Sequence, residues 1–322
     1  MESLFIRVLK KKGEESRRKL TELGVIDKSL KIISDNNDLL IPVIKPVDGF
    51  DIEKGDFKLL KKEESIAEFL GYSPAYEQVG DIAIIDKHEP DAQKVAEVLL
   101  RQNKIKTVLF SETSINGEYR TRGVTILAGE KKTQTLYREN NCRYLLDLAS
   151  VYFTPRLSTE RMRIADKVKN GDKVVDMFAG VGPFSILIAK KFPDAQVIAI
   201  DKNPDAIYYL KENVKLNKVN NVEIKEGDAR DIAKDISEAD HIIMNLPHSG
   251  LEFLDAALGM IRKGGVIHFY AMSHEDDLYE GILMKIKEIA GNAGFHVNPL
   301  DKRIVRPYAP YQHNICIDFQ VI

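Results

Sequence analysis

The stretch VDMFAGVGPFS, residues 175–185, joins an apolar strand to an apolar helix through a turn that contains two glycines. In a strand–turn–helix unit of this kind, bare backbone lets a ligand approach the helix N-terminus. The dinucleotide fingerprint G-x-G-x-x-G is incomplete because Ser185 occupies its third glycine position, which argues against NAD. The turn therefore predicts a ligand site of another class, and its candidate residues are Asp176, Phe178, Gly180 and Gly182.

Strand and helix patterns alternate regularly on both sides of this turn, from residue 156 onward. Apolar strands are expected in the segments KVVDMFA, QVIAID, VEIKEGD, HIIMNLP and GGVIHFYAM, with amphipathic helices between them. Such alternation predicts a doubly wound, mostly parallel α/β sheet. The tail segments RIVRPY and NICIDFQVI predict an antiparallel hairpin at the edge of that sheet.

Polar residues end three further strands of this predicted sheet. Asp201 lies twenty-one residues after Gly180, where a carboxylate can accept hydrogen bonds from both hydroxyls of a ribose. Asp228 ends the next strand, close enough to meet an adenine, and Asn245-Leu246-Pro247 closes the fourth. A single aspartate at such a place is more often a helix cap, but three aspartates at three strand ends favour a ligand site. We therefore expect a class I (Rossmann-like) methyltransferase domain that binds S-adenosylmethionine.

Composition and the positions of loop-forming Pro, Gly and Asp residues indicate three domains in the 322-residue chain. Residues 1–61 predict a small N-terminal α/β module that ends after a loop-like run, KPVDGFDIEKGD, at 45–56. Residues 62–154 predict an α+β middle domain, and residues 155–322 the methyltransferase domain. The expected elements of the first two domains are strands at 4–9, 82–85, 107–110, 119–126 and 133–137 and helices at 14–23 and 92–101.

The chain carries no sequence signal for a membrane span or a signal peptide, so we expect a cytoplasmic protein. Cys142 and Cys316 stand alone without metal-ligand spacing, and we expect both in the core and no metal site. The net charge of −2 gives no general case for nucleic-acid binding. Residues 101–143 are locally basic, however, with nine Lys or Arg against four Glu, which becomes relevant only beside a catalytic site.

Several segments, in order along nearly the whole chain, resemble the archaeal and eukaryotic tRNA (guanine-37 N1)-methyltransferase family. They are GEYRTRG, LAGE, VYFTPRLSTER, VDMFAGVGPFS, IAIDKNPDAI, IIMNLP and RIVRPYAP. The chain departs from the family at Ser158-Thr159, where glycines are usual; this change affects loop stiffness and no proposed catalytic atom. The tripeptide NLP also differs from the NPPY motif of exocyclic-amine methylases, which favours attack by a ring nitrogen.

The resemblance implies roles for individual residues. Glu160 would be the general base for the N1 proton, Arg120 would stabilise O6, and Asn245 would hold the edge of the base. These chemistries are sound for a carboxylate and a guanidinium, although without the resemblance Glu160 reads as a first-turn helix residue and Arg120 as a surface charge. Tyr152 would face an unstacked base. Arg156 would lie near the carboxylate of the cofactor and Pro247 would shape its methionine end.

The expected partner is tRNA, bound through the anticodon stem-loop by the basic middle domain and through the tRNA body by the N-terminal module. We expect a monomer that flips its target base. Three alternatives remain open: a wybutosine-pathway tRNA aminocarboxypropyl transferase, a bifunctional guanosine and wyosine-precursor methyltransferase, and a non-catalytic RNA-binding protein. Intact Asp176, Gly180, Gly182 and Asp201 argue against the last.

Overall fold

The computed structural model describes residues 1–60, 66–102, 104–112 and 122–322. These residues form two compact units, Met1–Ser73 and Pro74–Ile322. No helix within the described ranges is long and apolar enough to cross a membrane. The predicted domain boundary after residue 61 lies outside the described residues and stays a prediction.

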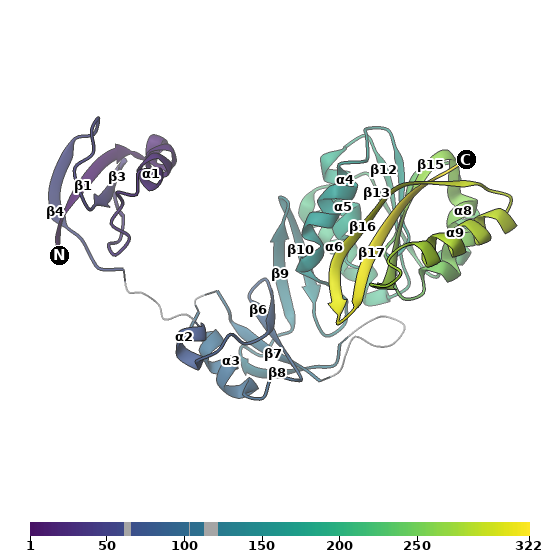
Figure 1. Cartoon of the computed structure of the whole chain (residues 1–322), viewed down its shortest axis with the longest axis horizontal. Coiled ribbons are helices and arrows are strands. Elements are labelled where there is room, and N and C mark those ends of the chain that lie inside the picture. Colours follow the sequence, from purple (N-terminus) through teal and green to yellow (C-terminus); the bar gives the residue numbers. More distant parts are fainter. Residues whose placement is uncertain (61–65, 103, 113–121) are drawn as a thin grey trace. The chain divides into compact units, whose positions relative to one another are not determined.

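The first unit is a four-stranded antiparallel sheet with one helix packed on it (Figure 1). Ile6 and Ile41 of the sheet and Leu20 of the helix are fully buried where the two meet. The sheet order is β2-β3-β1-β4. The elements are β1 (Glu2–Leu9), the 3-10 turn η1 (Lys10–Lys12), α1 (Gly13–Glu22), β2 (Ile33–Asp35), β3 (Asp38–Val43), β4 (Ile52–Asp56) and the short helix α2 (Ile66–Leu70).

The loop predicted over residues 45–56 was wrong in its second half, which forms strand β4. The backbone of β1 is the reason, because β4 pairs with it in antiparallel register, Ile52 beside Ile6. Phe57, the next residue, is buried with its ring centroid 5.5 Å from that of Phe5. Tertiary pairing has therefore overridden the local loop signal of Gly and Asp.

The second unit begins with a four-stranded sheet in the order β5-β6-β7-β8. Strands β6 and β7 are parallel and α3 connects them, and the other pairs are antiparallel. The elements are β5 (Tyr76–Val79), β6 (Ile82–Asp86), α3 (Ala92–Leu100), β7 (Thr107–Ser111) and β8 (Val124–Gly129). Apart from β5, these match the predicted middle-domain elements, although the first part of the strand predicted at 119–126 lies outside the described residues.

A separate hairpin, β9 (Gln134–Glu139) with β10 (Cys142–Asp147), follows this sheet. Its two-residue turn, Asn140-Asn141, has positive φ at both positions, as the twist of a tight hairpin requires. Asn213 of α6 (Pro204–Asn217) donates to the Leu145 carbonyl at 3.0 Å and accepts from its amide at 2.6 Å. The hairpin thus packs on the large sheet domain described next, and Cys142 lies in their shared core.

The large domain is a seven-stranded sheet in the order β13-β12-β11-β14-β15-β17-β16. Its first five strands are parallel, and β16 and β17 form the antiparallel hairpin predicted at the edge. The strands are β11 (Lys173–Asp176), β12 (Gln196–Asp201), β13 (Val222–Glu226), β14 (Ala239–Met244), β15 (Ile261–His274), β16 (Val297–Ala309) and β17 (Gln312–Val321).

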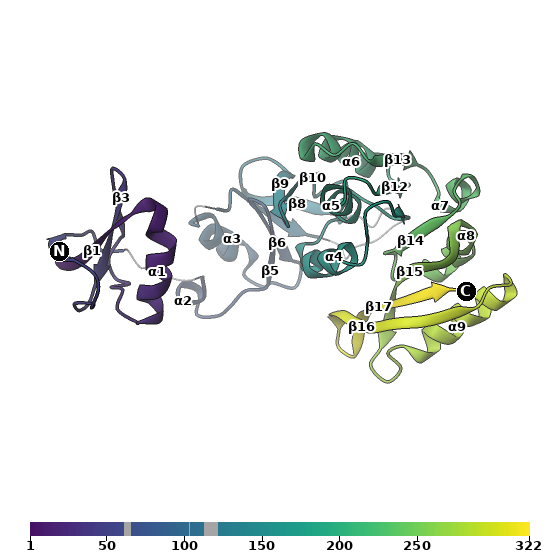
Figure 2. The ribbon, with the colours of Figure 1, turned by 90° about the horizontal axis from the view of Figure 1, so that it is seen from above.

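Helices cover both faces of this sheet, so the predicted doubly wound α/β fold is confirmed (Figure 2). On one face lie α4 (Ser158–Ala165), α5 (Pro183–Lys191) and α6, and on the other lie α7 (Ala229–Ile232), α8 (Leu254–Met260) and α9 (Glu280–Asn292). Short 3-10 turns are η2 (Pro155–Leu157), η3 (Ala233–Asp235) and η4 (Gly250–Phe253). Strand order reverses between β11 and β14, which is where an open sheet of this class binds ligands.

Candidate functional site

A cavity of about 740 Å³ opens at the carboxyl ends of the parallel strands, on both sides of the β11–β14 switch point. Its size is that of an ordinary small-molecule site. One end is lined by the turns after β11, β12 and β13, including Gly180, Asp201 and Asp228, and we call it the glycine-turn end. The other is lined by Arg306, Tyr308 and Asn314 of the β16–β17 hairpin, and we call it the hairpin end.

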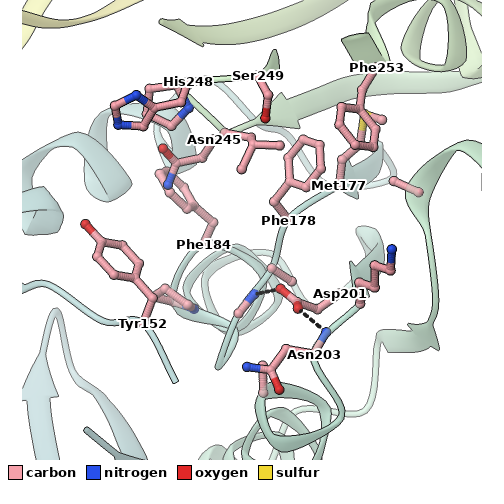
Figure 3. Close-up of a pocket in the computed structure, with 18 of the residues that line it drawn as sticks. Tyr152, Met177, Phe178, Phe184, Asp201, Asn203, Asn245, His248, Ser249 and Phe253 are labelled. Carbon is pink, nitrogen blue, oxygen red and sulfur yellow. Dashed lines mark hydrogen bonds between the residues drawn. The ribbon is translucent and has the colours of Figure 1, made fainter. Parts of the chain in front are cut away.

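Asp201 fixes the glycine turn through both of its carboxylate oxygens. Oδ2 accepts the backbone N–H of Gly180 at 2.6 Å and Oδ1 accepts that of Asn203 at 2.8 Å (Figure 3). Burial raises the pKa of Asp201 above its ordinary value. Gly180 has a φ of +56°, and a Cβ there would meet only the Tyr152 carbonyl oxygen, at 3.9 Å. The turn therefore presents bare backbone to open space beside a carboxylate with unused lone pairs.

Asp176 and Gly182 support the turn from below and do not line the cavity. Asp176 is fully buried and accepts a hydrogen bond from the Ser185 hydroxyl at 2.7 Å. Burial raises its pKa to about 7. Gly182 has a φ of +88° just before Pro183 begins α5, and a Cβ there would lie 2.3 Å from Leu210 Cδ1. Ser185, which breaks the dinucleotide fingerprint, is thus the partner of the buried carboxylate.

Asp228 lines the cavity and caps α7, accepting the Arg230 amide at 3.0 Å. The Arg230 guanidinium also bonds both carboxylate oxygens and lowers the pKa of Asp228 to about 2. Phe178 lies beside Phe253 in an edge-to-face contact with 5.0 Å between ring centroids. This part of the cavity therefore combines a flat apolar wall with a carboxylate that stays ionised at neutral pH.

Asn245 and Pro247 line the cavity in the loop after β14. The Pro247 carbonyl accepts the Met272 amide of β15 at 3.0 Å, which ties the loop to the sheet. In Figure 3, Asn245 and His248 lie on one side of the cavity and Asp201 lies on the opposite side. The Asn245 amide can both donate and accept from this position.

Tyr152 and Phe153 have separate surroundings despite being neighbours. Tyr152 lines the cavity, and Figure 3 shows its ring on the side opposite Phe178. Phe153 is 4% exposed and packs 5.1 Å from the ring of Tyr137. Arg156 lies elsewhere: its side chain is 60% exposed and 3.7 Å from Glu77, and it is not among the lining residues.

Residues 135–298 match the family described as the TRM5/TYW2 methyltransferase domain. Residues 6–51 match the tRNA methyltransferase 5 N-terminal domain, and residues 58–133 match the TYW2 N-terminal domain. The curated tRNA (guanine(37)-N(1))-methyltransferase Trm5b of Pyrococcus abyssi is 45% identical, with 99% of each chain covered. The chain belongs to the TRM5/TYW2 methyltransferase family.

Two solved structures place the chain within this TRM5/TYW2 family. The complex of aTrm5 with tRNALeu is 34% identical with a TM-score of 0.71, and covers 98% of this chain and 99% of that one. TYW2 of Methanocaldococcus jannaschii in complex with AdoMet is 32% identical with a TM-score of 0.62, and covers 77% of this chain and 100% of that one. The Trm5 structure thus matches nearly the entire chain, whereas the TYW2 structure leaves almost a quarter of it unmatched.

The glycine-turn end fits the nucleoside half of a cofactor. Ribose hydroxyls beside an aromatic base would fit this end. The space over Gly180 is open, Asp201 has spare lone pairs for the hydroxyls, and Phe178 provides an apolar wall for the base. Burial without a cation partner raises the pKa of Asp201, and hydroxyl donors from a ligand would favour its ionised form.

Glu160 lies behind the cavity wall, in the first turn of α4, and not among the lining residues. Its side chain is 7% exposed. Arg163 donates to both of its oxygens, at 2.6 and 2.9 Å, and the Tyr270 hydroxyl donates to Oε1 at 2.8 Å. The carboxylate is therefore fully engaged in this conformation, and its assignment as a base stays a prediction.

Arg120, the predicted O6 donor, lies outside the described residues. Its neighbour Arg122 donates to Glu77 Oε2 at 3.1 Å, and Glu77 Oε1 accepts the Thr154 hydroxyl at 2.8 Å. Thr154 lines the cavity. The segment just before β8, which carries Arg122, is thus tied, through one carboxylate, to the segment between Tyr152 and α4.

Sequence reasoning missed several lining residues. Most important are Arg306, Tyr308 and Asn314 at the hairpin end. Two of these belong to the segment RIVRPYAP, which the family resemblance singled out without a role. Asn203 was also missed, although its position before Pro204 is a recognisable helix-cap signal.

Proposed function

We propose that this chain transfers the methyl group of S-adenosylmethionine to N1 of guanosine at position 37 of tRNA. The observation that carries the proposal is a full-length, 45% identical relationship to a curated Trm5b, together with a cavity whose glycine-turn end fits a nucleoside. When bound, S-adenosylmethionine supplies an electrophilic sulfonium methyl. Transfer of that methyl group to N1 would require a protein base to accept the guanine N1 proton.

Of the four protein groups proposed for this reaction, two position the base and two act on its charge and its proton. Asn245 holds the edge of the base from the loop after β14, and Tyr152 faces the base from the side opposite Phe178. Arg120 stabilises charge that collects on O6, and Glu160 accepts the N1 proton. Because Arg163 engages the Glu160 carboxylate, this last role requires the Glu160 side chain to change rotamer when tRNA binds.

Incubating the protein with radiolabelled S-adenosylmethionine and an unmodified tRNA transcript tests the proposal. We expect label in 1-methylguanosine at position 37 and in no other nucleoside. A matched transcript with adenosine at position 37 is the control and should remain unlabelled. Label at another nucleoside, or none with the guanosine transcript, would exclude the proposed reaction.

The related aminocarboxypropyl transfer is distinguished by the spent cofactor. Methyl transfer leaves S-adenosylhomocysteine, whereas aminocarboxypropyl transfer leaves methylthioadenosine. The full-length match to the aTrm5 complex with tRNALeu and the partial match to TYW2 favour methyl transfer. Methylation of a wyosine precursor uses the same cofactor chemistry, and the same assay with precursor-bearing tRNA would detect it.

The proposed partner is tRNA, because a solved relative covering nearly the whole chain is a tRNA complex. We propose that residues 62–154 contact the anticodon stem-loop and that residues 1–61 contact the tRNA body, acting as a monomer in the cytoplasm. Light scattering of the mixture tests the stoichiometry, with one protein expected per tRNA. Deleting residues 1–61 should weaken tRNA affinity without affecting cofactor affinity.

A further inference from the structure

The hairpin end of the cavity contains two buried polar atoms without a hydrogen-bond partner among the described residues, Arg306 Nε and Asn314 Oδ1. Both residues line the cavity, and Asn314 is 3% exposed. A buried polar atom without a partner is unfavourable in a folded protein. Two such atoms in one ligand cavity therefore mark the place where a ligand completes the hydrogen bonding.

The two residues are neighbours in the sheet. Arg306 of β16 is paired with Asn314 of β17, and Asn314 is paired on its other side with Met272 of β15, another lining residue. Side chains of directly paired residues project from the same face of a sheet. The hairpin thus offers one N–H donor and one oxygen acceptor as a unit.

This pair lies far from the nucleoside half of the cofactor. Strand β17 is four positions from β12, which carries Asp201, so roughly 19 Å of sheet separates them at about 4.8 Å per strand. Asn245, the residue proposed to hold the target base, lies between them at the end of β14. The hairpin end therefore faces the target base and not the ribose of the cofactor. Tyr308 limits this end through its edge-to-face contact with His248, with ring centroids 5.7 Å apart.

We infer that Asn314 and Arg306 read the minor-groove edge of the target guanine, an inference that rests on the proposed function. Asn314 Oδ1 accepts a hydrogen from the exocyclic N2 amine, and Arg306 Nε donates to N3. This edge is the one that matches the pair, because it has a donor beside an acceptor. The N1 position must face the sulfonium methyl, and the N7/O6 edge offers acceptors alone.

The pair would make these two residues specificity determinants. Adenine has N3 but carries a C–H where guanine carries N2, so Asn314 would remain unpaired against it. A site with a buried acceptor rejects analogues that lack the matching donor more strongly than an apolar pocket rejects a missing methylene.

Functional-group substitution in the tRNA tests the inference. The measurement is the single-turnover kcat/KM on tRNA with guanosine, inosine or 7-deazaguanosine at position 37. Inosine lacks only the N2 amine, and we expect the unaltered protein to methylate it about 5- to 100-fold less efficiently. The 7-deazaguanosine tRNA is the matched control and should react like guanosine, because N7 has no role in the proposed contact.

The Asn314→Ala variant tests the protein side of the same contact. On guanosine tRNA, its kcat/KM should fall by about the factor that separates guanosine from inosine in the unaltered protein. On inosine tRNA, its kcat/KM should not fall further, so that the guanosine-to-inosine ratio of kcat/KM approaches one. Calorimetric affinity for S-adenosylmethionine should be unchanged, which a general loss of structure would not allow. An Asn314→Ala protein that keeps the native guanosine-to-inosine ratio would overturn the contact.

Two further outcomes separate this inference from the proposed function. If the unaltered protein methylates guanosine and inosine tRNAs equally, the N2 contact is wrong even though N1 methylation stands, and this result needs no variant to fold. If guanosine tRNA receives no methyl group, the proposed function fails first. For Arg306, the matched probe is 3-deazaguanosine at position 37: the Arg306→Gln variant should discriminate against it less than the unaltered protein does.

Discussion

Asp201 at the glycine-turn end has both carboxylate oxygens bonded to backbone amides, whereas Arg306 and Asn314 at the hairpin end each keep a buried polar atom without a partner in the described part of the chain. The first arrangement is set before any ligand arrives, because the turn itself supplies the donors. The second is completed only by a ligand. The glycine-turn end therefore resembles a preorganised cofactor site, and the hairpin end resembles a reading site for a substrate that enters later.

The surroundings of the two ends differ in the same way. The glycine turn is held by Asp176 and by the start of α5, both within one strand–turn–helix unit. The hairpin end draws on β15, β16 and β17 and on the buried ion pair between Arg163 and Asp318 below it. Asp201 of the adjacent strand β12 also holds this turn, so the first end is built from neighbouring parallel strands and the second from the antiparallel pairing of β15, β17 and β16.

The largest expected effect concerns Glu160, whose carboxylate accepts hydrogen bonds from Tyr270 of β15 and Arg163 of α4. If it takes the N1 proton, Glu160→Gln should slow single-turnover methylation ~10²–10⁴-fold while tRNA and cofactor still bind, because the amide has no basic lone pair. Glu212→Gln is the matched control, because Glu212 is partly exposed, pairs with Lys215 and does not line the cavity.

A purely structural Glu160 would give a different pattern. The variant would then lose thermal stability in proportion to rate, because Arg163 would lose one of its carboxylate partners and keep Asp318. A Glu160→Gln protein that binds both ligands and methylates at near-native speed would remove the residue from the reaction.

Arg120 comes next in expected size. Arg120→Ala should lower the single-turnover rate ~100-fold or more, on the scale of removing one oxyanion donor. Arg120→Lys should restore it only in part, because an ammonium lacks the planar fork of a guanidinium. Arg122→Ala is the control, since Arg122 is paired with Glu77. If the Arg120 variant is normal and the Arg122 variant slow, the O6 donor is Arg122.

Asp201 tests the glycine-turn end alone. Asp201→Ala should cost roughly 1.5–3 kcal/mol of cofactor binding, or about 10- to 150-fold in affinity, because it removes a charged hydrogen-bond partner. Affinity for tRNA should change little, as the carboxylate faces only the nucleoside half. Calorimetry with each ligand separates the two quantities, and the exposed Asp231→Ala serves as control. Equal losses of both affinities would contradict the division of the cavity into two ends.

The same division explains what could be predicted from sequence. Asp201, Asp228 and Asn245 were predictable because each ends a strand with a clear apolar pattern, and carboxyl ends of parallel strands meet at one edge. All three line the cavity. The antiparallel edge hairpin was also predictable as a fold element.

Arg306 and Asn314 were not predictable, because which face of an edge hairpin meets the cavity depends on register with β15. Strand β16 has no buried residue and β17 is buried at consecutive positions, so neither shows the alternation that would tell which face meets the cavity. Strand β10 was missed although its CRYLLD sequence buries alternate residues, Cys142, Tyr144 and Leu146. The Asn140-Asn141 turn before it was a usable hairpin signal.

The smallest expected effect is a pH dependence to which two buried groups contribute with opposite signs. His241 lies in β14, 3.4 Å from Asp172 and with its Nδ1 3.1 Å from His268 Nε2, and burial followed by repulsion from His268 lowers its pKa to about 4. Asp172, Asp240 and Arg262 are the other charged groups that act on it. A histidine with a lowered folded pKa binds fewer protons in the folded protein, so its contribution to stability is lost as pH falls below about 6.5. Asp176 acts in the opposite direction, because burial raises its pKa to about 7 and its folded form gains protons over the same window.

Denaturant unfolding at pH 7 and pH 5.5 measures both signs. His241 should lower the free energy of unfolding by about 1 kcal/mol between pH 7 and pH 5.5, and the His241→Asn variant should lack this decrease. Asp176 should raise the free energy of unfolding by a similar amount over the same interval. The Asp176→Asn variant should lack this increase and should therefore be less stable at pH 5.5 than at pH 7. The two contributions partly cancel in the unaltered protein, and its own curve should therefore be nearly flat. If both variants shift the pH dependence in the same direction, His241 and Asp176 do not have the opposite effects on stability that their pKa shifts indicate.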